Sequence, residues 1–300
     1  MTVSTNEMSQ RGPCAQTGNL RRRRLINRAL EVTAWVAAVI AVGTLAVVIG
    51  SVVLKGISSL SWQFLTTPTA PFGSGGGISN AIIGTGILVA VATAMAVPLG
   101  MLIAIFTSEL AGPRLSFLFR YVLDVLNGVP TIIIGIFIFG LMVVGHQQSG
   151  LAGSVALTIV MLPLVARSSH EVLSLVPDAV KEAAMALGAS RWRTTLTVVV
   201  PTALSGMITG ALLAVARAAG ETAPLLFTSS IFPNLVQTKL SQALPNIPVT
   251  IFQFSESPEP AKHAQAWAAA LVLIAFVLLI NVTARSFLAR SRRQLGSSGR

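Results

Sequence analysis

Arg217 and Glu221 form a charged pair inside an otherwise apolar run, AVARAAGETAPLLF, at positions 214–227. A charge at the centre of a bilayer costs at least about 2.5 to 3.5 kcal/mol on insertion scales, so charges in such a run indicate a functional site by default. Side chains four positions apart share one face of a helix, and we expect these two to pair and partly neutralise each other. Two interpretations are open: an ion pair that locks two spans together or lies near the outer interface, and a group that takes part in transport.

A second candidate region is the polar segment VPDAVKEAAMALGASRWRTTLTVVVP at 176–201. Pro177 suits the first turn of a helix, where its missing N–H costs nothing, and Asp178 complements the positive end of the helix dipole. Gly188 can adopt the left-handed conformation that ends a helix, and Ser190 can cap the next helix with its hydroxyl. The segment therefore predicts a helix, a sharp glycine turn and a second helix.

The composition around these candidates is that of a multi-span membrane protein. Hydrophobic residues make up 53% of the chain and charged residues only 10%, and the mean hydropathy of +0.76 is too apolar for a water-soluble globule. A formal charge of +11 suggests nucleic acid in a soluble protein, but here the basic residues flank apolar segments, where they fix membrane orientation. Because no basic surface is interleaved with aromatic residues for base stacking, we expect no nucleic-acid partner.

Six apolar runs are expected to cross the bilayer, because a helix rising about 1.5 Å per residue needs about twenty residues for about 30 Å of hydrocarbon. In chain order they cover positions 32–54, 82–106, 122–144, 151–166, 202–227 and 264–283. Prolines within them at 98, 130 and 163 are expected to kink these helices rather than break them, since neighbouring helices can satisfy the freed carbonyls. Pro201 marks the entry into the fifth span.

The basic residues predict the orientation. With six spans and an interior amino terminus, all of the 21 basic residues fall on one side except Lys55, Lys239 and Lys262 on the other side and Arg217 in the membrane. The positive-inside rule therefore places both termini in the cytoplasm. Two outer loops, at 55–81 and 228–263, are long enough to receive a partner.

The segment at 176–201 resembles the EAA loop of binding-protein-dependent ABC importer permeases. The family pattern is E-A-A, three residues, G, nine residues, I, one residue and L-P, and the same spacing joins Glu182, Ala183, Ala184, Gly188 and Pro201. Val198 and Val200 stand where Ile and Leu are usual, and both keep the apolar character. The resemblance implies a coupling helix that docks in a groove of a separate ATPase subunit and carries its motion to the spans.

The chemistry of this loop is compatible with such docking. The small side chains of Ala183 and Ala184 permit close approach of a partner surface, Glu182 can pair with a basic groove, and Gly188 holds the bend. From spacing alone, an ordinary membrane-surface connector is an equally good interpretation.

The run around the charged pair, ARAAGETAPLLFT at 216–228, resembles the signature of PstA-type permeases of the phosphate-specific ABC importer. Supporting stretches are GGISNAIIGT at 76–85, VPLG at 97–100 and LNGVPTIIIGIF at 126–137. The APLL that follows GET favours the PstA type over its PstC-type partner. Together with the EAA loop, the resemblance covers roughly half of the chain.

The resemblance implies an all-α membrane protein of type I ABC importer architecture, with six transmembrane helices and both termini cytoplasmic. Residues 1–31 are then an amino-terminal tail, residues 32–284 the permease domain with its loop at 176–201, and residues 285–300 a basic tail. It further implies a non-catalytic subunit in a bacterial cell membrane that contacts lipid and pairs with a PstC-type permease. Two ATPase subunits and an extracytoplasmic phosphate-binding protein complete the importer.

Within this family, Arg217, Glu221 and Thr222 are the residues expected to form the substrate pathway or its gate. A phosphate anion crossing hydrocarbon needs a compensating cation, and Arg217 offers both charge and a planar fork of donors that matches phosphate oxygens. Glu221 holds the arginine, keeps the empty pathway near neutral and prevents phosphate from binding too tightly to leave. In the alternative, Arg217 gates the pathway through a rearranging ion pair and never touches substrate. Asp124 is a lesser candidate, an interfacial or packing carboxylate.

Several chemistries are not predicted. The glycine cluster GSGGG at 73–77 lacks the lysine of a phosphate-binding G-x-x-x-x-G-K-[ST] loop, so ATP is expected to be handled by another chain. The histidines lie on different segments without metal-ligand spacing, and no serine is paired with histidine and a carboxylate; we expect no metal, no cofactor and no catalytic residue. The histidines in question are His146, His170 and His263.

Three other functions stay open as alternatives. The first is a permease of the same machinery for another oxyanion, sulfate or molybdate. The second is a secondary transporter or channel that uses the charged pair as a relay without an ATPase, against which the EAA loop argues. The third is a signalling role that reports transport state to a regulatory protein, which can coexist with import.

Overall fold

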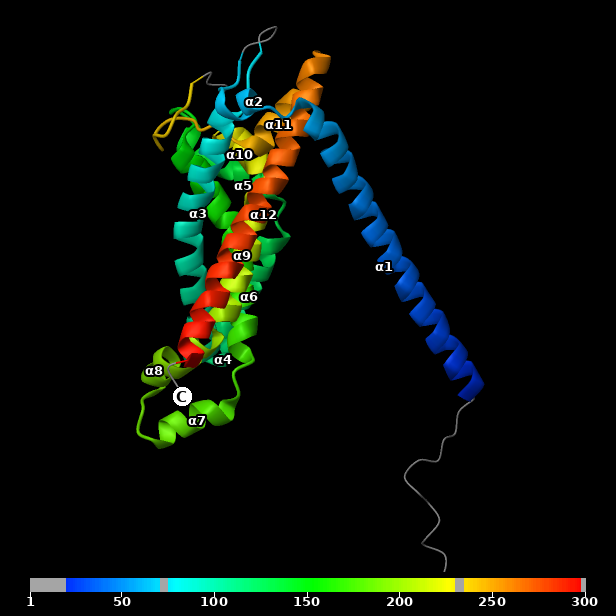
Figure 1. Ribbon diagram of the computed structural model, residues 1–300. Coiled ribbons are helices and arrows are strands. Elements are labelled where there is room, and N and C mark those ends of the chain that lie inside the picture. The colour runs from blue at the N-terminus through cyan, green and yellow to red at the C-terminus, as the bar shows by residue number, and fades with distance from the viewer. Residues whose placement is uncertain (1–19, 71–74, 230–234, 298–300) are drawn as a thin grey trace, which may run out of the picture. The chain divides into compact units, whose positions relative to one another are not determined.

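The computed structural model describes residues 20–70, 75–229 and 235–297, and these are built from helices and their connections without a strand (Figure 1). The chain divides into two units, residues 1–51 and 52–300. Helix α1 (Leu20–Gly56) supplies the described part of the first unit and ends in the second. Most of the expected amino-terminal tail, with the single cysteine Cys14, lies outside the described residues.

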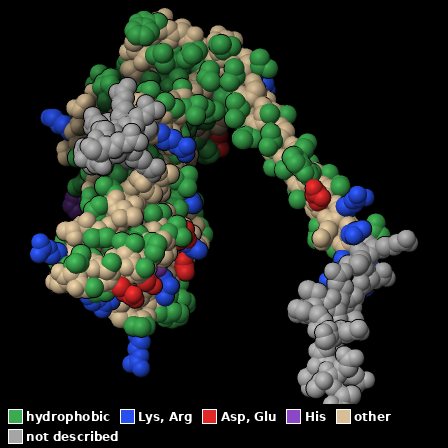
Figure 2. All heavy atoms as spheres, turned by 60° about the horizontal axis from the view of Figure 1, so that its bottom comes forward, with side chains coloured by type: hydrophobic (Ala, Val, Ile, Leu, Met, Phe, Trp, Pro, Cys, Tyr) green, Lys and Arg blue, Asp and Glu red, His purple; other side chains and the backbone are tan. Residues whose placement is uncertain are grey.

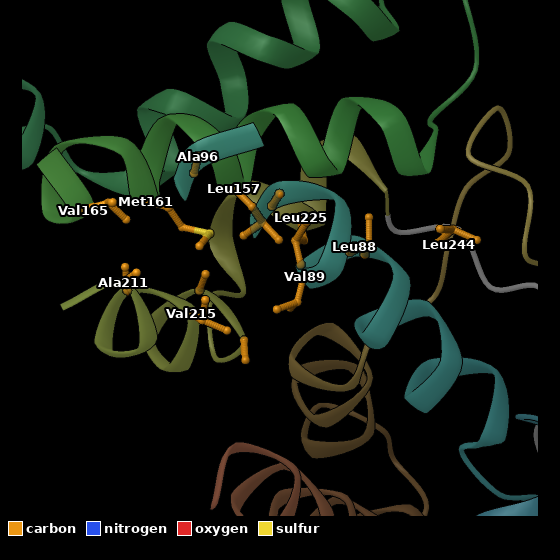
Figure 3. Close-up of a cluster of buried hydrophobic side chains, with 14 of the residues drawn as sticks. Leu88, Val89, Ala96, Leu157, Met161, Val165, Ala211, Val215, Leu225 and Leu244 are labelled. Atoms are coloured by element: carbon orange, nitrogen blue, oxygen red, sulfur yellow. The ribbon is translucent and has the colours of Figure 1, made fainter. Parts of the chain in front are cut away.

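The second unit is a bundle of long helices, α3 (Ser79–Ile105), α6 (Gly150–Ser174), α9 (Val200–Ala218) and α12 (Pro260–Ser297). Leu88 of α3 and Leu157 and Met161 of α6 are almost fully buried, and they meet Val215 of α9 and Leu225 in one apolar cluster (Figure 3). Many of the other members of this cluster are alanines, and small side chains allow membrane helices to approach closely. The largest apolar core therefore lies where α3, α6 and α9 pack together.

The expected membrane crossings are found in part. Among the described residues, five helices are long and apolar enough to cross a membrane, and the number rises to six if a bent helix pair counts as one span. That pair is α4 (Pro113–Gly128) followed by α5 (Thr131–Ile138) and a π-helical turn, η3 (Phe139–Val143), with a bend of 95° at the break. These spans correspond to the six predicted runs in order.

The prediction that Pro130 only kinks its helix is wrong. Val129 and Pro130 are extended, with ψ angles of 128° and 131°, and the helix stops before them and restarts after them. A residue that precedes proline is sterically disfavoured in the helical region, which explains the stop. Pro98 and Pro163, by contrast, lie within the continuous helices α3 and α6, as predicted.

Two predicted span boundaries also need correction. The fourth span, expected at 151–166, continues along α6 to Ser174, so the stretch between this span and the segment at 176–201 is mostly helical. The fifth span, expected as one helix at 202–227, ends at Ala218, and a separate short helix, α10 (Ala223–Thr228), follows. Pro224 explains the break, because within a continuous helix its ring would clash with the carbonyl of Gly220.

The two ends of the second unit carry different short elements (Figure 1). One end holds α7 (Asp178–Ala186) and α8 (Arg191–Thr194), and π-helical turns lie at the end of α3 (η2, Phe106–Leu110) and between α8 and α9 (η4, Thr195–Val199). Pro201 therefore follows a helical run already under way, where it was expected to open the span. The other end holds η1 (Ile57–Ser59), α2 (Trp62–Thr66) and α11 (Ile247–Ser255), within the segments expected as outer loops.

Candidate functional site

The charged pair lies at the end of α9. Arg217 is in the last turn of this helix, and Glu221 follows beyond the helix end, with 3.6 Å between Arg217 Nε and Glu221 Oε1. The expectation that a helix holds both residues is therefore wrong, although the two side chains do face each other. A basic residue in the last turn also compensates the negative end of the helix dipole. The arginine side chain is 53% exposed and the glutamate 15%.

Backbone hydrogen bonds hold the turn that replaces the helix. The N–H of Gly220 donates to the carbonyl of Arg217 at 3.0 Å, and the N–H of Glu221 donates to the carbonyl of Ala218 at 3.1 Å. Ala218 and Ala219 are each only 1% exposed, so the turn is anchored in the core. Thr222 follows as the residue that opens α10, and its carbonyl accepts from the N–H of Leu226. The backbone is fixed while the guanidinium stays accessible.

The broken spans meet directly beside this turn. A Cβ added to Gly135 of α5 would lie 2.7 Å from the Cα of Pro224, so the two short helices α5 and α10 touch at backbone distance. Elsewhere α5 keeps apolar side chains exposed, among them Ile133, Ile136 and Phe137. The breaks after Gly128 and Ala218 thus place two helix ends, rather than two continuous helices, around this part of the bundle.

The predicted helix, glycine turn and second helix at 176–201 are confirmed. Helix α7 begins at Asp178, Gly188 has a φ of +87°, and the Ser190 hydroxyl accepts from the N–H of Arg193 at 3.4 Å. No residue of α7 is buried, and both Glu182 and Ala183 are exposed, with Ala184 half-buried. Leu187 and Trp192, at the ends of the turn, also expose large apolar side chains. In the described part of the second unit, this surface is accessible to a partner protein.

Charged side chains gather at the end of the second unit that carries α7 and α8 (Figure 2). Arg167 of α6 donates to Asp124 of α4 at 2.9 Å and to Glu171 at 3.2 Å. All three side chains are more than half exposed, so water screens these pairs and they stabilise the fold little. Asp124 therefore links α4 to α6 at the surface and lies apart from the pair at Arg217.

Sequence reasoning missed the carboxylate of Glu109, in the π-helical turn η2. Its side chain is 8% exposed, and its Oε1 accepts from Lys181 Nζ of α7 at 3.0 Å. The Ser108 hydroxyl donates to the same oxygen at 3.0 Å, and Arg191 of α8 donates to the Glu109 carbonyl at 3.4 Å. These groups border a cavity of about 290 Å³ behind α7. The partners lie far apart along the chain, so no local spacing signals them.

The histidines do not converge. His170 lies within hydrogen-bond distance of the Thr107 hydroxyl, at 3.3 Å, whereas His146 and His263 contact backbone carbonyls of their own neighbourhoods. Among the described residues, no group of three or more His, Cys, Asp or Glu side chains is placed to hold a metal ion.

Comparisons with known proteins agree on one family. The family model described as "Binding-protein-dependent transport system inner membrane component" matches residues 96–293. A "Phosphate transport system permease protein PstA" of Yersinia pestis is 38% identical over 273 residues, which cover 90% of this chain and 92% of that protein. A "Phosphate transport system permease protein PstA 1" of Mycobacterium tuberculosis is 34% identical over 282 residues, which cover 91% of this chain and 92% of that protein.

Solved structures with the same fold are subunits of ABC transporters. A chain of the MetNI methionine ABC transporter, in an inward-facing conformation, has a TM-score of 0.56 at 18% identity and covers 71% of this chain and 93% of its own. A chain of a bacterial alginate ABC transporter, in complex with a periplasmic protein that binds alginate pentasaccharide, has a TM-score of 0.60 at 13% identity, covering 90% and 96%. At these identities the likeness is one of fold.

Proposed function

This chain belongs to the family of binding-protein-dependent transport system inner membrane components and within it to the PstA permeases, and we propose from this membership that it is the membrane-spanning subunit of an ATP-driven phosphate importer. The observation that carries the proposal is the extent of the similarity, because relatives named as phosphate transport permeases match 90% of the chain. The subunit is non-catalytic, and a partner ATPase hydrolyses ATP.

The proposed topology has six spans, with the bent pair of α4 and α5 counted as one, and both termini in the cytoplasm. The five apolar helices and this pair support the number of spans. The distribution of basic residues supports the orientation, since the positive-inside rule places the basic ends of α1 and α12 and the α7–α8 loop on one side. Residues 1–31 and 285–300 are then cytoplasmic tails around a permease domain at 32–284.

The proposed partners follow from this arrangement. The exposed face of α7, with Glu182, Ala183 and Ala184, docks on an ATPase subunit, and the positive φ of Gly188 fixes the turn behind it. A PstC-type permease forms the other half of the pathway, and an extracytoplasmic binding protein delivers phosphate to the end that carries α2 and α11. Two ATPase subunits lie beneath the two permeases.

Arg217 is proposed to act on phosphate in the pathway or at its gate, with Glu221 as its partner and Thr222 beside it. The exposed guanidinium supports this role, because it retains donors that the described part of the chain does not use. The neighbouring carboxylate keeps the site near neutral when it is empty. In the gating variant of the proposal, the 3.6 Å pair opens and closes without contacting the anion.

Radiolabelled phosphate uptake tests the proposal. Cells that lack this permease are complemented with wild type, with Arg217→Gln or with the matched control Lys239→Gln, which removes an exposed basic side chain outside the helices. We expect wild type and the control to restore uptake and the Arg217 variant to assemble with the ATPase but transport at least about tenfold more slowly.

Each result has a distinct meaning. Normal transport by the assembled Arg217 variant makes the arginine structural and leaves the permease assignment intact. If the wild-type permease restores uptake of labelled sulfate or molybdate but not of labelled phosphate, phosphate is not the substrate. Uptake that persists without the ATPase contradicts the ATP-driven mechanism and favours a secondary transporter.

A further inference from the structure

We propose that Glu109 and Lys181 form a latch that ties α7 to the end of α3, so that α3 follows α7 when the ATPase moves it. This inference rests on the proposed function, because it assigns a coupling role to α7. It adds a positioning residue, Glu109, that lies outside the EAA loop and outside the charged pair in the membrane.

The burial of the pair is the first argument. The Glu109 side chain is 8% exposed and that of Lys181 is 20% exposed, and the two are 3.0 Å apart. Lys181 also lies 3.5 Å from Asp178, but that carboxylate is 87% exposed. Because solvent screens an exposed pair far more than a buried one, the bond to Glu109 is the one that holds Lys181.

The position of Glu109 relative to the glycine turn is the second argument. Lys181 precedes Gly188 and bonds the Glu109 carboxylate, whereas Arg191 follows Gly188 and bonds the Glu109 carbonyl at 3.4 Å. One residue at the end of α3 thus contacts both arms of the helix–turn–helix. Rotation of either α7 or α8 about the turn at Gly188 would therefore displace Glu109.

The covalent connections are the third argument. Helix α8 continues through η4 into α9, so motion of the loop reaches α9 along the backbone. Helix α3 is not joined to this loop along the backbone, and the ion pair between Glu109 and Lys181 gives it a direct contact. No residue of α7 is buried, so apolar packing contributes little to its position and the polar contacts carry more weight.

The local structure also leaves room for movement. A cavity of about 290 Å³ lies between α7, α8 and η2, and the buried hydroxyl of Thr194 at its edge has no hydrogen-bond partner among the residues that the structure describes. Both η2 and η4 are π-helical turns, which are frequent at functional sites and mark places where a helix changes its winding. The latch therefore borders a cavity that side chains of α7, α8 and η2 do not fill.

The test uses the complete importer in liposomes, with its second permease, ATPase subunits and phosphate-loaded binding protein. Phosphate moved and ATP hydrolysed are measured together for wild type, Lys181→Met, Glu109→Gln and the exchanged pair Glu109→Lys with Lys181→Glu. Asp178→Asn is the matched control, because it removes the exposed partner of Lys181 and leaves the latch intact.

We expect both single variants to retain the ATPase and to hydrolyse ATP, but to move roughly five- to tenfold less phosphate per ATP, in the range of ordinary coupling between linked sites. The exchanged pair regains most of this ratio, and Asp178→Asn keeps it.

Three results overturn the latch: an unchanged ratio in Lys181→Met, an exchanged pair no better than the single variants, or loss of the ATPase from Lys181→Met, which makes Lys181 a docking residue. A wild-type complex that moves no phosphate contradicts the proposed function itself, and the latch falls with it.

Discussion

The Arg217 guanidinium is charged, but the carboxylate of Glu221 does not form a short hydrogen bond with it. The 3.6 Å between its Nε and Glu221 Oε1 is longer than a hydrogen bond of ordinary strength. The carboxylate therefore attracts the guanidinium electrostatically without forming a strong hydrogen bond to it. An arginine has five donors in a rigid fork, and a phosphate can take two of them at once. The loose geometry is compatible with the proposed role, in which Arg217 exchanges one anionic partner for another.

Substitution of Glu221 by Gln tests this exchange at the scale of one residue. Without the carboxylate, phosphate meets no competitor for Arg217, so we expect both the KM and the maximal rate of uptake to fall, by about three- to tenfold each. Concentration-dependent uptake separates the two constants. A raised KM with an unchanged maximal rate contradicts competition for the arginine, and normal kinetics in both makes the pair structural. Glu31→Gln, which removes an exposed carboxylate from α1, far along the chain from this pair, serves as the matched control.

Single residues could be predicted where the signal is local. Gly188 and Ser190 were predicted from turn and capping chemistry, and the structure places both in those roles. The pairing of Arg217 with Glu221 followed from their spacing, although α9 ends at Ala218 and does not extend to Glu221. The contact of Glu109 with Lys181 could not be predicted, because it depends on how η2 and α7 pack.

At the scale of elements, the contact between α5 and α10 positions the turn that carries the charged pair. Gly135 leaves no space for a side chain, since a Cβ there would lie 2.7 Å from Pro224 Cα and 3.2 Å from the Pro224 carbonyl oxygen. The nearest atoms belong to backbone, which cannot rotate away as a flexible side chain can. A larger residue must therefore push the two helices apart.

Gly135→Ala is expected to destabilise the protein by about 1 to 3 kcal/mol through overpacking. The gain of about 0.5 to 1 kcal/mol that alanine brings to a helix interior is smaller, so the net effect is a loss. Thermal unfolding of the purified protein in detergent measures it. Gly86→Ala in α3 is the control, because nothing lies within 4 Å of its Cβ position, and it should be neutral or stabilising. Equal effects of both substitutions would show that the close contact is not the cause.

The order of the apolar elements could be predicted from hydropathy, and their number agrees if α4 and α5 count as one span, but their ends could not be predicted. The run at 202–227 is apolar throughout apart from the charged pair, and average hydropathy does not register that Gly220 and Pro224 interrupt its backbone. The same holds for Pro130, where the restriction on the preceding residue outweighed the tendency of membrane helices to tolerate proline. Ser174, the end of α6, lies in a polar stretch where hydropathy gives no signal, and packing against α3 and α9 continues the helix.

At the scale of the whole molecule, the unequal distribution of basic residues carries the proposed orientation. Charged side chains gather at the end with α7 and α8 (Figure 2), whereas the segments at 55–81 and 228–263 contain only three basic residues, Lys55, Lys239 and Lys262. The chain contains a single cysteine, Cys14, in the tail before α1. It is therefore a natural probe for the side on which the amino terminus lies.

We expect a membrane-impermeant maleimide to label Cys14 in inverted vesicles and not in intact spheroplasts, because the positive-inside rule places this tail in the cytoplasm. The double variant Cys14→Ser with Ser58→Cys moves the probe to an exposed position in η1 and should reverse the pattern. Labelling of Cys14 from outside contradicts the orientation, and labelling of both probes from the same side contradicts an odd number of crossings between them.

The 95° break between α4 and α5 has a consequence for how the protein is made. Helix α4, with 16 residues, is about 24 Å long, and the 8 residues of α5 with the 5 of η3 reach about 20 Å, so neither crosses about 30 Å of hydrocarbon alone. These pieces pack against α6 and α10, which leave the ribosome later. We therefore expect stable insertion of this crossing to depend on α6 and α10, segments that are synthesised after it.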